Sequence, residues 1–262
     1  MKNMEELRQE KEKTYRLVLF IGELLLKNGG ETFRVERLCS EICASKGFKH
    51  LNLFITPTCI MIGDDRADGI TFIKQIKERT INLEKVSQTN QVAIDVIKNT
   101  EIPFVEIIKK LKLIEQVEIY SPFVKLIGAG IGSGSFVLVF NSTFLEAFLV
   151  VLVSMISLWL YKKVIEMVSI PIFGTVIATF LISTAGFFLT KYNIIENSNL
   201  VIIGSILPFL PGMAITKSIS DLVSGDFISG SARATEAFLT ALSIGIGVGI
   251  GMKIWLKIGG VF

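Results

Sequence analysis

The pattern of charged and apolar positions divides the chain into two parts. Most of its Lys, Arg, Asp and Glu residues fall within residues 1–120, whereas from Lys125 onward charges are sparse and separate long apolar runs. Uncharged runs of this length are typical of membrane-spanning helices. We therefore predict a soluble domain over residues 1–120 and a membrane domain over residues 121–262.

The apolar positions of the N-terminal part predict a small α+β domain. Helical spacing of apolar residues over 4–27 ends at the pair Gly29 and Gly30, which is a strong helix stop. Two runs rich in β-branched residues, 50–62 and 70–76, flank a turn of glycine and aspartate and predict a β-hairpin. The predicted helices of this domain cover 4–27, 31–46, 82–98 and 103–117.

Five uncharged runs in the second half predict transmembrane helices. Two of the runs are short, but Glu146, Glu236 and Lys253 lie near helix ends, where long side chains reach the interface. The predicted fold is an α-helical polytopic membrane domain of five transmembrane helices, preceded by a small soluble α+β domain. The five helices are expected at about 123–141, 143–161, 168–190, 198–216 and 235–256.

The placement of charge predicts the orientation in the membrane. The start of the chain lacks the apolar core of a signal peptide, so we expect the N-terminal domain to stay in the cytoplasm. The loops that then lie inside carry most of the lysines and arginines, as the positive-inside rule requires. Five helices place the C-terminal Phe262 outside. We thus expect a multi-pass protein of the inner or plasma membrane, with no nucleic acid among its partners.

Few residues suit metal binding or catalysis. Cys39, Cys43 and Cys59 form no C-x-x-C pair, and His50 is the single histidine. We therefore expect small buried cysteines in a reducing compartment, with no metal site and no cofactor. The sequence contains neither G-x-S-x-G nor H-E-x-x-H. These observations favour a protein that is not an enzyme.

Glycine alternates with apolar residues in the first and fifth predicted helices. Glycines four residues apart let helix backbones approach closely, so tight helix packing is one interpretation and a backbone-lined permeation path is the other. No dinucleotide-binding motif fits either run. The glycines are Gly128, Gly130, Gly132 and Gly134 in the first helix, and Gly245, Gly247, Gly249 and Gly251 in the fifth.

The fourth predicted helix contains two prolines and a glycine in the middle of an apolar run. Pro208 and Pro211 remove backbone donors, and Gly212 adds flexibility, so we do not expect a continuous helix. Broken helices form the mid-membrane substrate sites of many secondary transporters. A passive proline kink is the alternative.

The segment that follows alternates charge with glycine and apolar residues. We expect a short helix or a re-entrant turn at the inner mouth, in which Arg233 pairs with a nearby carboxylate; ordinary interfacial charges are the alternative. The candidate partners are Asp221, Asp226 and Glu236. Glu146, between two predicted helices, is either an interface residue or a proton carrier.

Two sets of motifs resemble the threonine/serine exporter family. In the N-terminal half they are NGGETFRVE (28–36), FITPT (54–58) and RTINLEKV (79–86), and in the second half they are LPFLPG (207–212) and DLVSGDFISGSARATEA (221–237). The resemblance covers nearly the whole chain. The soluble-domain residues that carry it include Glu31, Arg34, Glu36, Thr56, Pro57, Arg79 and Asn82.

The resemblance implies an exporter of small polar metabolites, with threonine or serine as the first substrate and a dicarboxylate such as succinate as the alternative. Fused members of the family carry a second membrane region, so this chain resembles the larger subunit of a two-chain exporter. Its expected partners are a smaller polytopic membrane subunit, the substrate and the lipid bilayer, and a homo-oligomer is also open. The residues expected to bind substrate or to couple transport are Pro208, Pro211, Gly212, Asp221, Asp226, Arg233 and Glu236.

No ATP-binding motif is present in the sequence, so an ion gradient is the expected energy source. Asp221 and Glu236 are candidate proton sites, and the half-helix ends near residues 208–212 are expected to meet the substrate carboxylate. A different class of function also fits the sequence. In that alternative the chain is a membrane-anchored sensory or scaffolding protein whose soluble domain binds a ligand or a partner.

Overall fold

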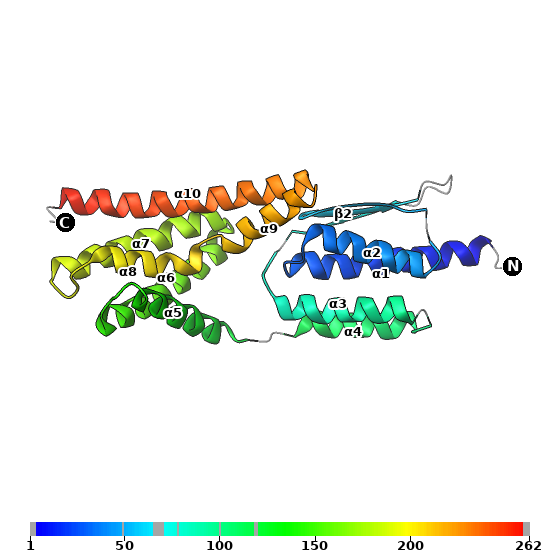
Figure 1. Ribbon diagram of the computed structural model, residues 1–262, viewed down its shortest axis with the longest axis horizontal. Coiled ribbons are helices and arrows are strands. Elements are labelled where there is room, and N and C mark those ends of the chain that lie inside the picture. Colours follow the sequence, from blue (N-terminus) through cyan, green and yellow to red (C-terminus); the bar gives the residue numbers. More distant parts are fainter. Residues whose placement is uncertain are drawn as a thin grey trace. The chain divides into compact units, whose positions relative to one another are not determined.

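The computed structural model is mostly helical and describes residues 4–48, 50–64, 71–77, 79–99, 101–117 and 120–258 (Figure 1). It contains two compact units. The first unit comprises Met1–Val117 and Thr216–Ala234, and the second comprises Glu118–Ile215 and Thr235–Phe262. The first unit therefore includes a segment from the second half of the sequence.

The first unit begins with two helices, α1 (Met4–Lys27) and α2 (Thr32–Ser45). The helix α1 forms because apolar residues recur every three or four positions, and Leu17, Ile21 and Leu24 are almost completely buried. These helices match those predicted over 4–27 and 31–46.

A three-stranded antiparallel sheet follows, in the order β1-β2-β3. The prediction of a two-stranded hairpin was wrong because the run 50–62 forms two strands. Pro57 has no backbone N–H to donate, and Thr56 Oγ1 accepts a hydrogen bond from Cys59 N at 3.0 Å, so the chain turns there. Part of the turn predicted over 63–69, and Ile70, lie outside the described residues. The strands are β1 (Asn52–Thr56), β2 (Cys59–Gly63) and β3 (Thr71–Gln75).

Two more helices, α3 (Leu83–Lys98) and α4 (Phe104–Gln116), complete the core of the first unit and match the helices predicted over 82–98 and 103–117. Side chains from α1, α2, the sheet, α3 and α4 form one apolar cluster. Its largest fully buried members are Tyr15, Leu17, Ile21, Leu24, Ile42, Ile60, Ile62 and Leu111.

The helices of the second half differ in their capacity to cross a membrane. Among the described residues α6, α7 and α10 are each long and apolar enough, and α8 with η1 forms a pair with α9 that is bent by 54°. The apolar helix α5 has 17 residues. Three or four candidate crossings are therefore found, and a fifth remains a prediction. The elements are α5 (Pro122–Leu138), α6 (Phe144–Val168), α7 (Pro171–Lys191), α8 (Ser198–Ile206), η1 (Leu207–Phe209), α9 (Gly212–Val223) and α10 (Phe227–Lys257).

Each glycine stripe packs on one side. A Cβ at Gly130 would lie 2.7 Å from Met155 Cγ of α6, and one at Gly134 would lie 2.8 Å from the Ala147 carbonyl oxygen. Likewise, Cβ atoms at Gly247 and Gly251 would overlap side chains of α7. The Cβ positions of Gly128, Gly132, Gly245 and Gly249 meet no described atom within 4 Å outside their own helix. Among the described residues, half of the glycines in each stripe therefore pack against another helix.

Glu146 closes the start of α6. Its carboxylate accepts a hydrogen bond from Thr143 N at 2.8 Å, and its own N–H donates to Thr143 Oγ1 at 3.2 Å. This reciprocal arrangement is a capping box, which satisfies backbone donors at the helix N-terminus. The carboxylate therefore has a structural role at this helix end.

Candidate functional site

The turn between α1 and α2 presents backbone carbonyls to other segments of the first unit. Gly29 has a φ of +98°, which favours glycine and ends α1. The segment just before α3 is hydrogen-bonded to this turn. Thr80 N donates to Lys27 O at 2.7 Å, and Asn82 N donates to Asn28 O at 3.0 Å. Asn82 also caps α3 by accepting a hydrogen bond from Lys85 N.

Two cations from α9 and α10 reach the same turn. Lys217 Nζ donates to the carbonyl oxygen of Gly29. Arg233 Nη2 donates to the carbonyl oxygen of Gly30 and to Thr32 Oγ1, both at 3.4 Å. Backbone carbonyl oxygens carry partial negative charge, so the carbonyls of Gly29 and Gly30 stabilise the two cations placed beside them.

An acidic residue of α9 pairs with the arginine. Arg233 Nε donates to Asp221 Oδ2 at 2.9 Å, and the exposed fractions of these two residues are 8% and 0%. Of the three carboxylates expected as partners of Arg233, the structure pairs it with Asp221. We call Gly29, Gly30, Thr32, Lys217, Asp221 and Arg233 the turn cluster.

The turn cluster has unused hydrogen-bonding capacity. Among the described residues no partner is found for the second carboxylate oxygen of Asp221, Oδ1, which is buried. The hydroxyl of Ser229, one turn before Arg233 on α10, is also buried without a partner in this part of the chain. Buried polar atoms are nearly always satisfied in folded proteins, so each such atom calls for an explanation.

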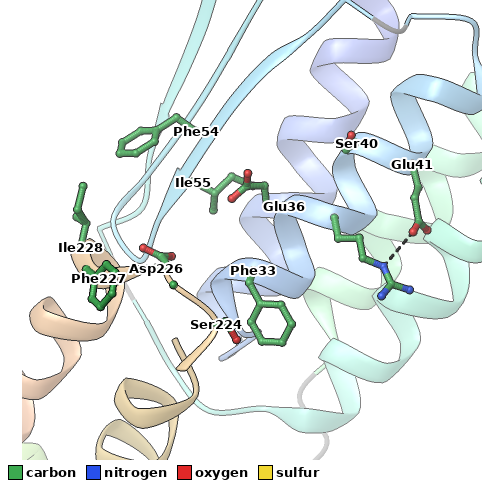
Figure 2. Close-up of a pocket in the computed structure, with 12 residues that line it drawn as sticks. Phe33, Glu36, Ser40, Glu41, Phe54, Ile55, Ser224, Asp226, Phe227 and Ile228 are labelled. Carbon is green, nitrogen blue, oxygen red and sulfur yellow. Dashed lines mark hydrogen bonds and ion pairs between the residues drawn. The ribbon is translucent and has the colours of Figure 1, made fainter. Parts of the chain in front are cut away.

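A pocket of about 750 Å³ lies in the same unit, lined by α2, β1 and the turn between α9 and α10 (Figure 2). Glu36 of α2 and Asp226 of the turn both line it. Partial burial raises the pKa of Glu36 above its usual value, and the negative charge of Asp226 raises it further. A second acidic residue of α2, Glu41, pairs with Arg37 at 3.0 Å.

Comparison with known protein families identifies the family of this chain. Residues 16–255 match the family described as "Putative threonine/serine exporter". The chain belongs to this exporter family. Searches of curated proteins and of solved structures found no match. Together, the family and the apolar helices identify a membrane protein of a transport family.

The exporter-family motifs that are far apart in sequence meet in the first unit. The motif at residues 28–36 supplies the turn and Glu36, the motif at 79–86 supplies Asn82, and the motif at 221–237 supplies Asp221 and Arg233. Glu31 precedes α2, and its Oε2 lies 2.6 Å from Arg34 Nε. Thr56 ends β1 and Pro57 lies in the turn to β2, which the hydrogen bond from Cys59 N to Thr56 Oγ1 closes.

The remaining predicted site residues lie elsewhere. Pro208, Pro211 and Gly212 lie at the break between η1 and α9. Glu236 is exposed on α10 and does not take part in the Arg233–Asp221 ion pair. Asp226 caps α10, since its Oδ1 accepts a hydrogen bond from Ser229 N at 3.0 Å.

Sequence reasoning did not select Lys217 or Thr32 as site residues. Lys217 and Asp221 are four residues apart on one helix, so they share a face, and this spacing was a usable signal. Nothing in the local sequence of Thr32 pointed to its contact with Arg233. Among the described residues no group of three or more His, Cys, Asp or Glu side chains could hold a metal ion.

Proposed function

We propose that this chain is a subunit of a secondary exporter that moves threonine or serine out of the cell. Family membership supports the reaction class, and the break in a membrane helix supports a transport site within this chain. The observation that carries the proposal is the 54° bend between the helix ending at Phe209 and the helix beginning at Gly212.

The bend supplies the polar groups that a substrate needs in an apolar environment. Proline has no N–H, so Pro208 and Pro211 each remove a donor from the helix ladder, and nearby carbonyls lose their usual partners. In the first turn of α9, Gly212 N donates to Leu210 O at 2.9 Å and Ile215 N donates to Pro211 O at 3.0 Å, and this end of the helix carries a partial positive charge. A substrate carboxylate would be stabilised there.

The helix α9 connects this bend with the turn cluster. It begins at Gly212 and carries both Lys217 and Asp221. We propose that movement of the broken helix during transport is coupled to the turn cluster through this helix. Asp221 and Glu236 remain the proposed proton sites, and Asp221→Asn should lower efflux and flatten its pH dependence because Asn cannot ionise.

The proposed arrangement in the membrane keeps five crossings. The fifth crossing is α5, an apolar helix of 17 residues, and a bilayer that thins locally accommodates a hydrophobic stretch of this length. The soluble unit then lies in the cytoplasm and the C-terminus outside, and the smaller polytopic subunit is the proposed partner. A reporter fused to the C-terminus should signal from the outer side of the cell membrane, and a cytoplasmic signal would overturn this topology.

Efflux from proteoliposomes tests the function. The full chain is reconstituted with its co-expressed smaller subunit, and vesicles are loaded with radiolabelled threonine, serine or succinate in separate experiments. We expect gradient-dependent efflux of threonine and serine. Efflux of succinate alone would assign the exporter to dicarboxylates, and no efflux of any of these compounds would favour a sensory or scaffolding role.

A further inference from the structure

The pocket in the first unit combines negative charge with aromatic side chains. Its walls come from three segments that are distant in sequence: α2, the strand β1, and residues 224–228, which form the turn after α9 and the start of α10 (Figure 2). Phe33, Phe54 and Phe227 line it together with Glu36 and Asp226. Its volume, about 750 Å³, falls in the range of small-molecule sites.

The charge of this pocket is not balanced by the residues that the structure describes. Arg37 also lines the pocket, but its guanidinium is paired with Glu41. Neither Glu36 nor Asp226 forms an ion pair with another described residue. Partial burial raises the pKa of Glu36 and the negative charge of Asp226 raises it further, so a cation near both carboxylates would be favoured.

The lining indicates which kind of cation suits the pocket. Metal ions such as Mg²⁺ and Ca²⁺ require several oxygen ligands at once, and no group of three acidic, His or Cys side chains with that spacing exists among the described residues. Aromatic faces instead attract organic cations and cover their apolar parts. We propose that this pocket binds a small organic molecule through its primary ammonium group, held by Glu36 and Asp226.

The exported amino acid is the ligand that fits best, and this part of the inference rests on the proposed function. Threonine and serine carry an ammonium group and small side chains that the pocket volume accommodates. The segment 224–228 comprises the turn after α9 and the start of α10, so an occupied pocket would connect α2 to that turn. The pocket would thus report the internal amino-acid concentration to the helices that form the transport path.

Calorimetric titration of the full chain in lipid nanodiscs tests the inference. The probes are L-threonine, ethanolamine, N-acetyl-L-threonine, succinate and MgCl₂. We expect binding of threonine and ethanolamine, and none of the other three, because only these two carry a primary ammonium group. Binding of N-acetyl-threonine as tight as that of threonine, competition by MgCl₂, or no binding of either ammonium compound would overturn the proposal.

Charge-neutral variants locate the site. Glu36→Gln and Asp226→Asn should each weaken ethanolamine binding about tenfold, the effect of losing one charge-assisted hydrogen bond. Asn is a good N-cap residue, so Asp226→Asn keeps the cap of α10. Glu106→Gln is the matched control, because Glu106 lies on α4 outside the pocket and pairs with Lys110. Unchanged affinity in both pocket variants would contradict the assignment.

Failure of this inference can be told apart from failure of the proposed function. If the reconstituted exporter transports succinate but not threonine, while ethanolamine still binds and both pocket variants weaken it, the proposed substrate is wrong and the pocket assignment stands. If threonine is transported while no ammonium compound binds with sensitivity to Glu36 and Asp226, the pocket assignment is wrong and the function stands.

Discussion

Arg233 and Asp221 form a buried ion pair that joins two helices, with Nε and Oδ2 separated by 2.9 Å. Arg233 lies on α10 and Asp221 on α9, twelve residues earlier. The guanidinium also donates to Gly30 O and Thr32 Oγ1. One side chain therefore connects the hairpin of α9 and α10 with the start of α2.

Removing one member of this pair should destabilise the first unit. Asp221→Asn or Arg233→Gln leaves an uncompensated charge or a poorly satisfied polar group in a buried place, and breaking a buried pair costs about 3–5 kcal/mol. The double variant should lose less stability than the sum of the two single variants. Thermal unfolding of the purified full chain measures all three, and additive losses would show that the two side chains do not interact in solution.

Gly29 should be less replaceable than Gly47. Both have positive φ, +98° and +87°, so alanine costs about 1–2 kcal/mol of backbone strain at either position. A Cβ at Gly29 would also lie 2.7 Å from Lys217 Nζ, whereas a Cβ at Gly47 meets nothing within 4 Å. Gly29→Ala should therefore lower the unfolding temperature further than Gly47→Ala, because Lys217 must give up its hydrogen bond to Gly29 O, and equal losses would show that Lys217 moves aside at no cost.

The two sides of the glycine stripe on α10 should respond differently to alanine. A Cβ at Gly247 would overlap Thr179 Oγ1 and Val176 O of α7, and such overpacking costs about 1–3 kcal/mol. Gly249 is the matched control, because its Cβ position is open. The unfolding temperatures of Gly247→Ala and Gly249→Ala in the same lipid test this difference. Equal stability of the two variants would mean that α10 does not pack on α7 through Gly247.

The pH dependence of stability should reveal the raised pKa of Glu36. Burial and the charge of Asp226 raise its pKa in the folded chain, so the stability contributed by protonated Glu36 is complete below the unfolded pKa and is lost as pH rises through the folded pKa. Glu36→Gln should therefore be more stable than the wild type near neutral pH. The stability difference between Glu36→Gln and the wild type should shrink in acid. Unfolding temperatures across a pH series measure this difference, and a difference that grows in acid would contradict the raised pKa of Glu36.

The elements that depend on local pattern could be predicted from the sequence. The helix α1 follows from the spacing of Leu17 and Leu24 and from the glycine pair after Asn28, which stop it at the predicted place. The first predicted strand was wrong because β-branched residues continue across Pro57. The proline itself was the signal for the turn.

The turn cluster could not be assembled from the sequence. The contacts of Lys217 with Gly29 and of Arg233 with Gly30 join residues 188 and 203 positions apart. Periodicity describes which face a residue occupies and contains no information about pairings at that range. The resemblance supplied both motifs but not their contact.

Pro211 should be needed for transport rather than for stability. Pro211→Ala restores a backbone donor and removes a residue that costs about 3 kcal/mol inside a helix. The substitution therefore favours a straighter path from α8 into α9. Efflux should then fall while the unfolding temperature is kept or raised. Pro171→Ala is the matched control, because Pro171 begins α7, where proline is tolerated.

Spin labels at the exposed Ile203 and Ile215, placed in a cysteine-free chain, report the bend as a distance. A longer distance with unimpaired efflux would make the bend a passive kink, whereas a longer distance with lost efflux would tie the 54° bend to the transport path.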